Sequence, residues 1–363
     1  MNNKITKFLT NNIVPIVIFI IIAFCYPLAG LSPTYIVQEM IFRLSRNLFL
    51  VMSLLIPIIA GMGLNFGIVL GAMAGQIALV FITDWQIVGM QGIFLAFIIS
   101  IPISIGLGMM SGSILNRAKG KEMITSMILG FFINGVYQLI VLYGMGKIIP
   151  ITNSKLVLSR GYGIRNAIDL KNVRKVLDNF LSLKIGSIEI PIFVFIIVGL
   201  LAWFTIWFRK TKLGQDMEVS KTAGINVEKT RIIAIVISTV LAGFGQIIYL
   251  QNIGTMNTYN SHEQIGMFSI AALLVGGASA SRATIFNVIS GIFLFHMLFI
   301  VSPMAGKELM GSAQIGEYFR VFVSYGVIAL TLVLHQWRRE KEKNDLRKRQ
   351  MEERAREIED GDK

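Results

Sequence analysis

The sequence predicts an integral membrane protein built from α-helices, and three observations support this fold class. Hydrophobic residues make up 54% of the 363-residue chain and charged residues only 15%, whereas charged residues are about a quarter of a typical soluble domain. Apolar runs close to the roughly 20 residues that a helix needs to cross a bilayer recur along the chain. These runs are continuous and do not alternate between apolar and polar residues, which favours helices over a β-barrel.

About ten transmembrane helices are predicted within residues 1–336. In chain order the apolar segments span 13–30, 47–62, 64–83, 88–112, 122–146, 189–208, 231–251, 265–279, 283–303 and 319–336. The first segment follows Lys4 and Lys7 and is interpreted as a retained anchor and not a cleaved signal peptide, because so many further spans follow it. Closely spaced segments meet at Gly63 and again at Ala280, where small residues are typical of either a tight hairpin or a broken helix.

Basic residues in the short loops predict the orientation, because Lys and Arg accumulate on the cytoplasmic side of membrane proteins. With the N-terminus in the cytoplasm, the turn around Arg117, the loop at about 209–231, Arg282 and the charged tail at 337–363 all fall on that side. The segment at about 147–188 then lies outside the cell, although it is also basic. Long segments obey the charge rule least, so both termini are predicted to be cytoplasmic.

The net charge of +13 follows from this topology. In a soluble protein such a charge would suggest nucleic acid, but here the positive residues cluster at the ends of apolar runs, so no nucleic-acid partner is expected. Cys25 is the single cysteine and lies inside the first apolar segment. A disulfide or a cysteine metal site within the chain is therefore excluded, and no metal site is predicted.

The sequence contains no pattern that would supply energy for transport. It has no Gly-x-x-x-x-Gly-Lys-Ser/Thr loop, and residues 144–147, Gly-Met-Gly-Lys, are too short to hold a phosphate. Asp, Glu and Lys are absent from the middle of the predicted spans, where ion-coupled transporters carry them. Glu122 is expected at the positive end of a helix, and His296 is the only titrating group expected at depth, where a contact between helices is its commoner role. The chain is thus not expected to be an enzyme or to bind a cofactor, and any ATP chemistry would belong to another chain.

Neutral polar residues are the remaining chemistry inside the predicted spans. They are Asn65, Gln76, Asn134, Gln138, Gln246, Tyr249 and Asn287. Each commonly hydrogen-bonds between helices. Together they can also line a path for a neutral solute rich in hydroxyl groups, and the candidates for that path are Asn65, Gln76, Asn134 and Gln246. A path without fixed charge suits a sugar or a nucleoside better than an ion.

Glycines suggest how the helices pack. Gly63, Gly67, Gly71 and Gly75 recur every four residues, which predicts a smooth stripe for close helix packing on the third span. The segments 74–77 and 244–247 share the Gly-Gln-Ile sequence, as two related halves of a transporter would. Short matches between Gly-rich helices also arise by chance, so a two-half repeat stays open.

Three segments carry a resemblance to a known family. They are the loop Lys221-Thr222-Ala223-Gly224-Ile225-Asn226-Val227 followed by Leu241-Ala242-Gly243, the element Gly63-Leu64-Asn65-Phe66-Gly67-Ile68, and the helix start Glu122-Met123-Ile124-Thr125-Ser126-Met127-Ile128-Leu129. Together they resemble the permease subunits of bacterial ABC importers, from the family that serves branched-chain amino acids, ribose and other simple sugars, and nucleosides. The first is similar to the cytoplasmic coupling segment of that family, and the third to its simple-sugar and nucleoside branch.

The resemblance implies the partners and the working parts of the chain. It implies a permease in the bacterial plasma membrane that pairs with a second permease subunit, with cytoplasmic ATPase subunits that use ATP, and with an extracellular binding protein or lipoprotein. The coupling residues would be Gly214, Lys221, Ala223, Gly224, Ile225 and Asn226. A simple sugar or nucleoside is the expected solute, and the alternatives are a branched-chain amino acid or, from another class, a secondary transporter or channel.

Overall fold

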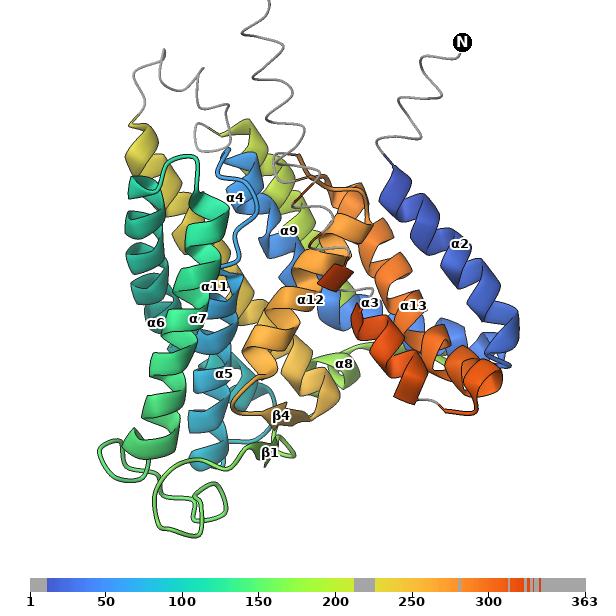
Figure 1. Cartoon of the computed structure of the whole chain (residues 1–363). Helices are drawn as coiled ribbons and strands as arrows, with labels where there is room; N and C mark the ends of the chain where they lie inside the picture. Colours follow the sequence, from blue (N-terminus) through green and yellow to red (C-terminus); the bar gives the residue numbers. More distant parts are fainter. Residues whose placement is uncertain are drawn as a thin grey trace, which may run out of the picture.

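The structure is a computed structural model, and it shows a bundle of helices with short strands at one end (Figure 1). It describes residues 12–211, 226–279, 282–312 and, beyond these, 314–322, 325–326, 329 and 333. The predicted tail at 337–363, the first 11 residues and most of the 209–231 loop lie outside the described residues. The predicted span at 319–336 falls only partly within them.

Six helices of the described part are long and apolar enough to cross a membrane. They are Pro33–Ile59, made of α3 (Pro33–Ser53) and α4 (Leu55–Ile59); α6 (Gly89–Arg117); Glu122–Gly144, made of α7 (Glu122–Leu139) and a π-helical turn (Ile140–Gly144); α9 (Ile192–Lys210); α11 (Val227–Ile253); and α13 (Ile285–Met310). Two shorter apolar helices accompany them in the described part, α2 (Ile13–Leu28) and α5 (Ile68–Asp84), together with the 15-residue α12 (Ser261–Val275). The all-helical membrane fold is confirmed, whereas the number ten and the sidedness of the termini remain predictions.

The helix predicted at 47–62 begins much earlier, at Pro33. Ser32 caps it by accepting a hydrogen bond from the Tyr35 amide at 3.3 Å, and Pro33 occupies the first turn, where proline is favoured. Polar residues in its first half, including Glu39 and Arg46, broke the hydropathy signal that the prediction used. Glu39, in the second turn of this helix, lies before the span that was predicted to begin at residue 47.

The segment predicted at 64–83 is a broken element and not a full span. Its first residues form a turn in which Gly63 has a φ of 77° and Asn65 Oδ1 accepts from the Gly67 amide at 2.8 Å, and α5 starts only at Ile68. At 17 residues, α5 spans about 25 Å, less than the roughly 30 Å hydrocarbon core. The 15-residue α12 is shorter still and ends before Gly277, whose φ is 84°.

Helix α11 lies at the centre of the bundle and packs against α3, α5 and α6 (Figure 1). A Cβ added at Gly71 would lie 2.3 Å from the Thr239 carbonyl oxygen, and one added at Gly75 would lie 2.3 Å from the Gly243 carbonyl oxygen. The glycine stripe is thus a packing surface for its helical half, whereas Gly63 and Gly67 precede the helix. The two similar segments at 74–77 and 244–247 lie on these adjoining helices.

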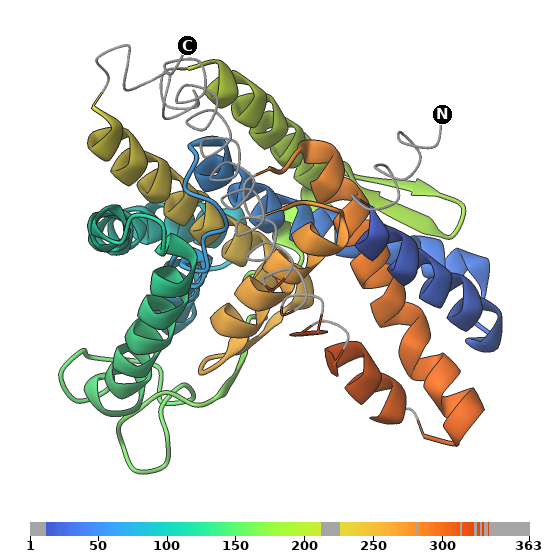
Figure 2. The same cartoon turned by 45° about the horizontal axis from the view of Figure 1, so that its top comes forward.

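Both views place α6 and α7 on one side of the bundle and α2 and α13 on the other (Figures 1 and 2). Helix α2 packs along α13. The α6–α7 turn and the neighbouring ends of α9 and α11 lie together at one end of the bundle, and β1 and β4 lie at the opposite end (Figure 1). The turn at 117–122 and the described ends of the 209–231 loop therefore share a side, as the charge pattern predicts.

The segment predicted to lie outside at about 147–188 is ordered against the helix ends. Strand β1 (Ala167–Asp169) pairs antiparallel with β4 (Thr255–Asn257), and β2 (Ser182–Ile185) pairs with β3 (Ile188–Pro191). The short helix α8 (Val176–Phe180) lies between them in sequence. Asp84, at the end of α5, accepts hydrogen bonds from the Thr152 and Asn153 amides, both at 2.8 Å, and so anchors this segment.

Candidate functional site

A buried polar cluster forms where α5, α7 and the β4–α12 connection meet. Gln76 of α5 is fully buried, and its Nε2 donates to Tyr137 Oη at 2.8 Å and to the Thr258 carbonyl at 2.5 Å. Tyr137 of α7 in turn donates from its hydroxyl to the same carbonyl at 2.8 Å. Three elements distant in sequence therefore share one hydrogen-bond network inside the bundle.

Asn134 extends this network to the first turn of α12. Its Nδ2 donates to Glu263 Oε2 at 2.8 Å, and its Oδ1 lies 2.8 Å from His262 Nε2. Because Asn134 presents an acceptor to the ring, His262 donates through Nε2. The His262 ring also packs edge-on against Tyr137, with 4.7 Å between centroids. Gln76 and Asn134, predicted separately as pathway residues, thus lie in one cluster.

The cluster retains unused hydrogen-bonding capacity. Gln76 Oε1, Thr258 Oγ1 and His262 Nδ1 are buried and have no partner among the described residues. Leaving such a group unpaired costs on the order of 1–3 kcal/mol, and a polar ligand that reached these atoms would recover part of that cost.

The other two predicted pathway residues lie outside the cluster. Asn65 is buried and holds the turn before α5, with its Nδ2 left without a partner among the described residues. Gln246 of α11 is fully buried, and neither of its amide atoms has such a partner. Gln246 lies beside α5, because a Cβ added at Gly75 would lie 3.1 Å from the Gln246 Cβ.

Four residues of the cluster were missed by the sequence analysis: Tyr137, Thr258, His262 and Glu263. The predicted span began at residue 265 and left out the Ser-His-Glu-Gln sequence before it. In the structure these four residues form the start of α12, which begins at Ser261. The prediction that His296 is the only titrating group at depth is therefore wrong, because His262 is fully buried as well. Tyr137 was detectable, since helical spacing places it on the same face as Asn134 and Gln138.

His296 itself occupies an aromatic environment in α13. It is 7% exposed, its ring contacts those of Phe295 and Phe299, and its Nδ1 has no partner among the described residues. These contacts agree with the packing role that the sequence analysis gave as the commoner one.

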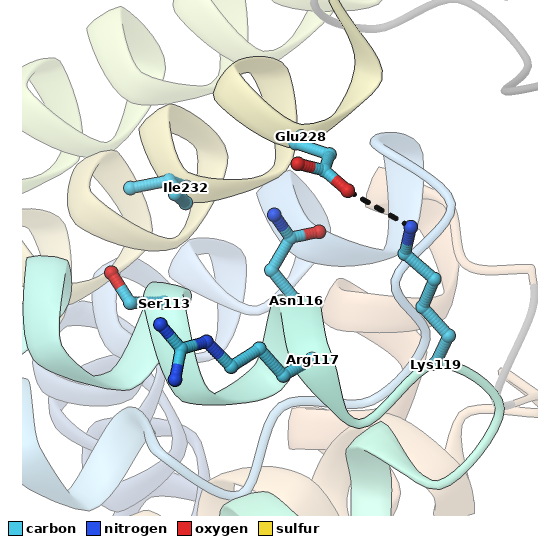
Figure 3. Close-up of a pocket in the computed structure, with 6 residues that line it drawn as sticks. All are labelled: Ser113, Asn116, Arg117, Lys119, Glu228 and Ile232. Carbon is cyan, nitrogen blue, oxygen red and sulfur yellow. Dashed lines mark hydrogen bonds and ion pairs between the residues drawn. The ribbon is translucent and has the colours of Figure 1, made fainter.

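At the opposite end of α7, ion pairs surround the start of α11. Arg231 of α11 bonds to Glu122 in the first turn of α7, and their side chains are 4% and 17% exposed. Lys119 pairs with Glu228 at 3.0 Å in an exposed position (Figure 3). The α6–α7 turn is therefore tied at two points to the helix that follows the predicted coupling loop.

The coupling residues themselves are only partly described. Gly214, Lys221, Ala223, Gly224 and Ile225 lie outside the described residues. Asn226 is the N-cap of α11, and its side chain accepts from the Lys229 amide at 3.1 Å. Its position in the motif thus serves to start the helix.

A groove of about 490 Å³ opens between the end of α6 and the start of α11 (Figure 3). It is lined by Ser113, Asn116, Arg117, Lys119, Glu228 and Ile232. This polar groove lies beside the first turn of α11 and so next to the predicted coupling loop.

The helical fold, with six membrane-length apolar helices among the described residues and a buried, mainly neutral polar cluster, defines a polytopic membrane protein. Residues 36–332 match the family described as branched-chain amino acid transport system / permease component. The match covers most of the chain, so the chain belongs to this permease family. With the apolar helices, it indicates a multi-pass protein of the bacterial plasma membrane.

Three curated proteins are similar to parts of the chain. The nucleoside ABC transporter permease protein NupC of Lactococcus lactis is 26% identical over 55% of this chain and 59% of its own length. The galactose/methyl galactoside import permease protein MglC of Salmonella typhimurium is 25% identical over 41% of this chain and 44% of its own. The xylose transport system permease protein XylH of Haemophilus influenzae is 25% identical over 40% of this chain and 38% of its own.

The chain thus spans about three fifths of the first relative and less than half of each of the others. No solved structure matches the chain.

Proposed function

We propose that the chain is the transmembrane permease subunit of an ATP-driven ABC importer for a simple sugar or a nucleoside. The buried cluster of Gln76, Asn134, Tyr137 and His262 carries the proposal, because it offers hydrogen-bond donors and acceptors suited to hydroxyl groups. The names of the relatives, which refer to nucleosides, galactose and xylose, support the same solute class.

In this proposal the solute moves along the predicted pathway residues Asn65, Gln76, Asn134 and Gln246. Their unpartnered buried atoms, Asn65 Nδ2, Gln76 Oε1 and both amide atoms of Gln246, support it. Asn65 lies in the turn that breaks the predicted span, and Gln76 lies in the short helix α5 that follows this turn. Broken helices next to polar side chains are typical of transporter binding sites near the membrane midplane.

Energy would come from partner chains. The coupling loop, with Gly214, Lys221, Ala223, Gly224, Ile225 and Asn226, would contact a cytoplasmic ATPase that binds the ATP, while this chain binds no cofactor. Movement of the loop would pull on α11, and the Arg231–Glu122 and Lys119–Glu228 pairs would carry that movement to α7. Since α7 supplies Asn134 and Tyr137, the motion would reach the polar cluster.

The complete importer would contain more than this subunit. We propose a second permease subunit, identical or homologous, two ATPase subunits and an extracellular binding protein or lipoprotein that delivers the solute. The permease would thus be a transport subunit within the bilayer and not an enzyme.

An uptake assay tests the solute class. Bacteria that lack their own importers would express the chain with the ATPase and binding protein encoded beside it and receive labelled adenosine, galactose, xylose or leucine in turn. Saturable uptake of at least one sugar or nucleoside is expected, with leucine excluded. Uptake of leucine alone would favour the branched-chain amino acid alternative and contradict the proposal.

A further inference from the structure

Glu263 is a part-buried carboxylate in the first turn of α12 with a single hydrogen-bond partner. Its Oε2 accepts from Nδ2 of Asn134, which lies near the middle of the span Glu122–Gly144. The ion pairs found among the described residues all join other side chains. A first-turn position in α12 stabilises a negative charge. A carboxylate without an ion pair, bonded to a residue near the middle of a membrane-length helix, is nevertheless costly and points to a function.

The wall around Glu263 is apolar. A small cavity of about 10 Å³ lies between α5, α7 and α12, and its lining includes Phe66, Met127, Phe131 and Met267 as well as Glu263. An apolar wall with one well-placed polar group is the usual form of a small-molecule site. The cavity has room for about one water molecule, so a sugar would enter only after α7 and α12 move apart.

Asn134 fixes how Glu263 is presented. Because Asn134 Oδ1 is held by His262, its Nδ2 is directed to Glu263 Oε2. This leaves Glu263 Oε1 without a partner among the described residues. Behind Asn134, the buried acceptor His262 Nδ1 is also unpartnered within the described part of the chain.

We propose that Glu263, oriented by Asn134, binds a pair of neighbouring hydroxyl groups on the solute. The inference rests on the proposed function and adds the chemical group that is recognised. A carboxylate accepts two hydroxyl hydrogen bonds at once, and bonds to a charged acceptor are about twice as strong as neutral ones. The apolar faces of Phe66 and Phe131 would cover the carbon–hydrogen face of the ring.

The experiment compares paired probes in the uptake assay above. Each imported solute is measured against an analogue that lacks a neighbouring hydroxyl: adenosine against 2′,3′-dideoxyadenosine, and galactose and xylose against their 2-deoxy forms. The wild type should show an apparent KM at least about tenfold lower for the intact solute, because a site built around a hydroxyl group discriminates against its absence.

Two variants assign that discrimination to the carboxylate. Glu263→Gln keeps an acceptor for Asn134 but loses the charge, so the KM for the intact solute should rise at least about tenfold and the preference should shrink. Glu189→Gln is the matched control, because Glu189 bonds to Gln38 only through its backbone. The level of each variant in the membrane is measured by fluorescence-detected size exclusion.

Each outcome decides the question. Equal KM values for intact and deoxy solutes in the wild type would overturn the inference even if Glu263→Gln failed to fold. Unchanged KM and preference in a well-expressed Glu263→Gln would overturn it while leaving the proposed function standing. A wild type that imports none of the sugars or nucleosides would instead overturn the proposed function, and this inference with it.

Discussion

At the scale of single residues, Asp178 links the segment outside the long helices to the bundle. It is 3% exposed, and its two oxygens accept from Gln251 Nε2 at 2.9 Å and from Asn252 Nδ2 at 3.1 Å. Arg46 of α3 donates to the same Asn252. Burial raises the pKa of the Asp178 carboxyl, while these two hydrogen bonds and the charges of Lys175 and Arg46 oppose the rise.

The raised pKa predicts a pH dependence. The folded chain binds the Asp178 proton more tightly than the unfolded chain, so this residue's contribution to the free energy of unfolding falls as the pH rises from about 3.9, the ordinary aspartate value, through the raised pKa. Asp178→Asn should abolish that contribution. The difference in thermal midpoint between wild type and variant, followed against pH, measures it.

Asp169→Asn provides the control, because the Asp169 side chain is 62% exposed in its pair with Arg174. Its effect on stability should be small, because an exposed pair contributes at most about 1 kcal/mol. Parallel curves for the wild type and Asp178→Asn would contradict the prediction.

The Arg231–Glu122 pair gives a second residue-scale prediction. Arg231→Met leaves the largely buried Glu122 carboxylate without its partner, and removing one member of a buried pair costs about 3–5 kcal/mol. Lys119→Met breaks the exposed Lys119–Glu228 pair and should cost at most about 1 kcal/mol. Thermal unfolding in detergent compares the stabilities of the two variants. Equal losses of stability would contradict a larger contribution from the buried pair.

At the scale of elements, the seam between α5 and α11 depends on glycine. Gly75→Ala places a Cβ 2.3 Å from the Gly243 carbonyl oxygen, so one helix must shift, at about 1–3 kcal/mol for overpacking. Gly106→Ala in α6 is the matched control, because a Cβ there meets nothing within 4 Å. It should be neutral or stabilising by up to about 1 kcal/mol. Thermal unfolding in detergent measures the midpoint of each variant. A midpoint for Gly75→Ala at or above that of Gly106→Ala would be incompatible with this packing.

The sequence predicted the presence of the helices better than the residues at which they begin and end. Continuous apolar runs marked α6, α7 and α9 within a few residues, because hydropathy reports lipid-facing helices directly. It failed for α3 and α12, which carry polar side chains that other helices satisfy, such as Arg46 with Asn252 and Glu263 with Asn134. Tertiary partners make such residues tolerable at depth, and no local pattern reveals those partners. For the same reason the cluster was predicted only through Gln76 and Asn134.

At the scale of the whole molecule, the two ends of the bundle should face opposite sides of the membrane. The lone cysteine makes this testable, since Cys25→Ala yields a cysteine-free background. Lys184→Cys, on the exposed strand β2, should react with a membrane-impermeant maleimide added to whole cells. Lys121→Cys, exposed beside the α6–α7 turn, should react only after the membrane is permeabilised. The reverse pattern would invert the topology.

The energy source of uptake tests the central claim most directly. Proteoliposomes would contain the chain with its ATPase and receive the binding protein loaded with labelled solute, and uptake would be followed with and without ATP and with ion gradients collapsed. An ABC permease predicts uptake that requires ATP, survives collapse of the gradients and persists in His296→Ala. Uptake without ATP that is abolished by collapsing the gradients and by His296→Ala would instead identify a secondary transporter and contradict the account.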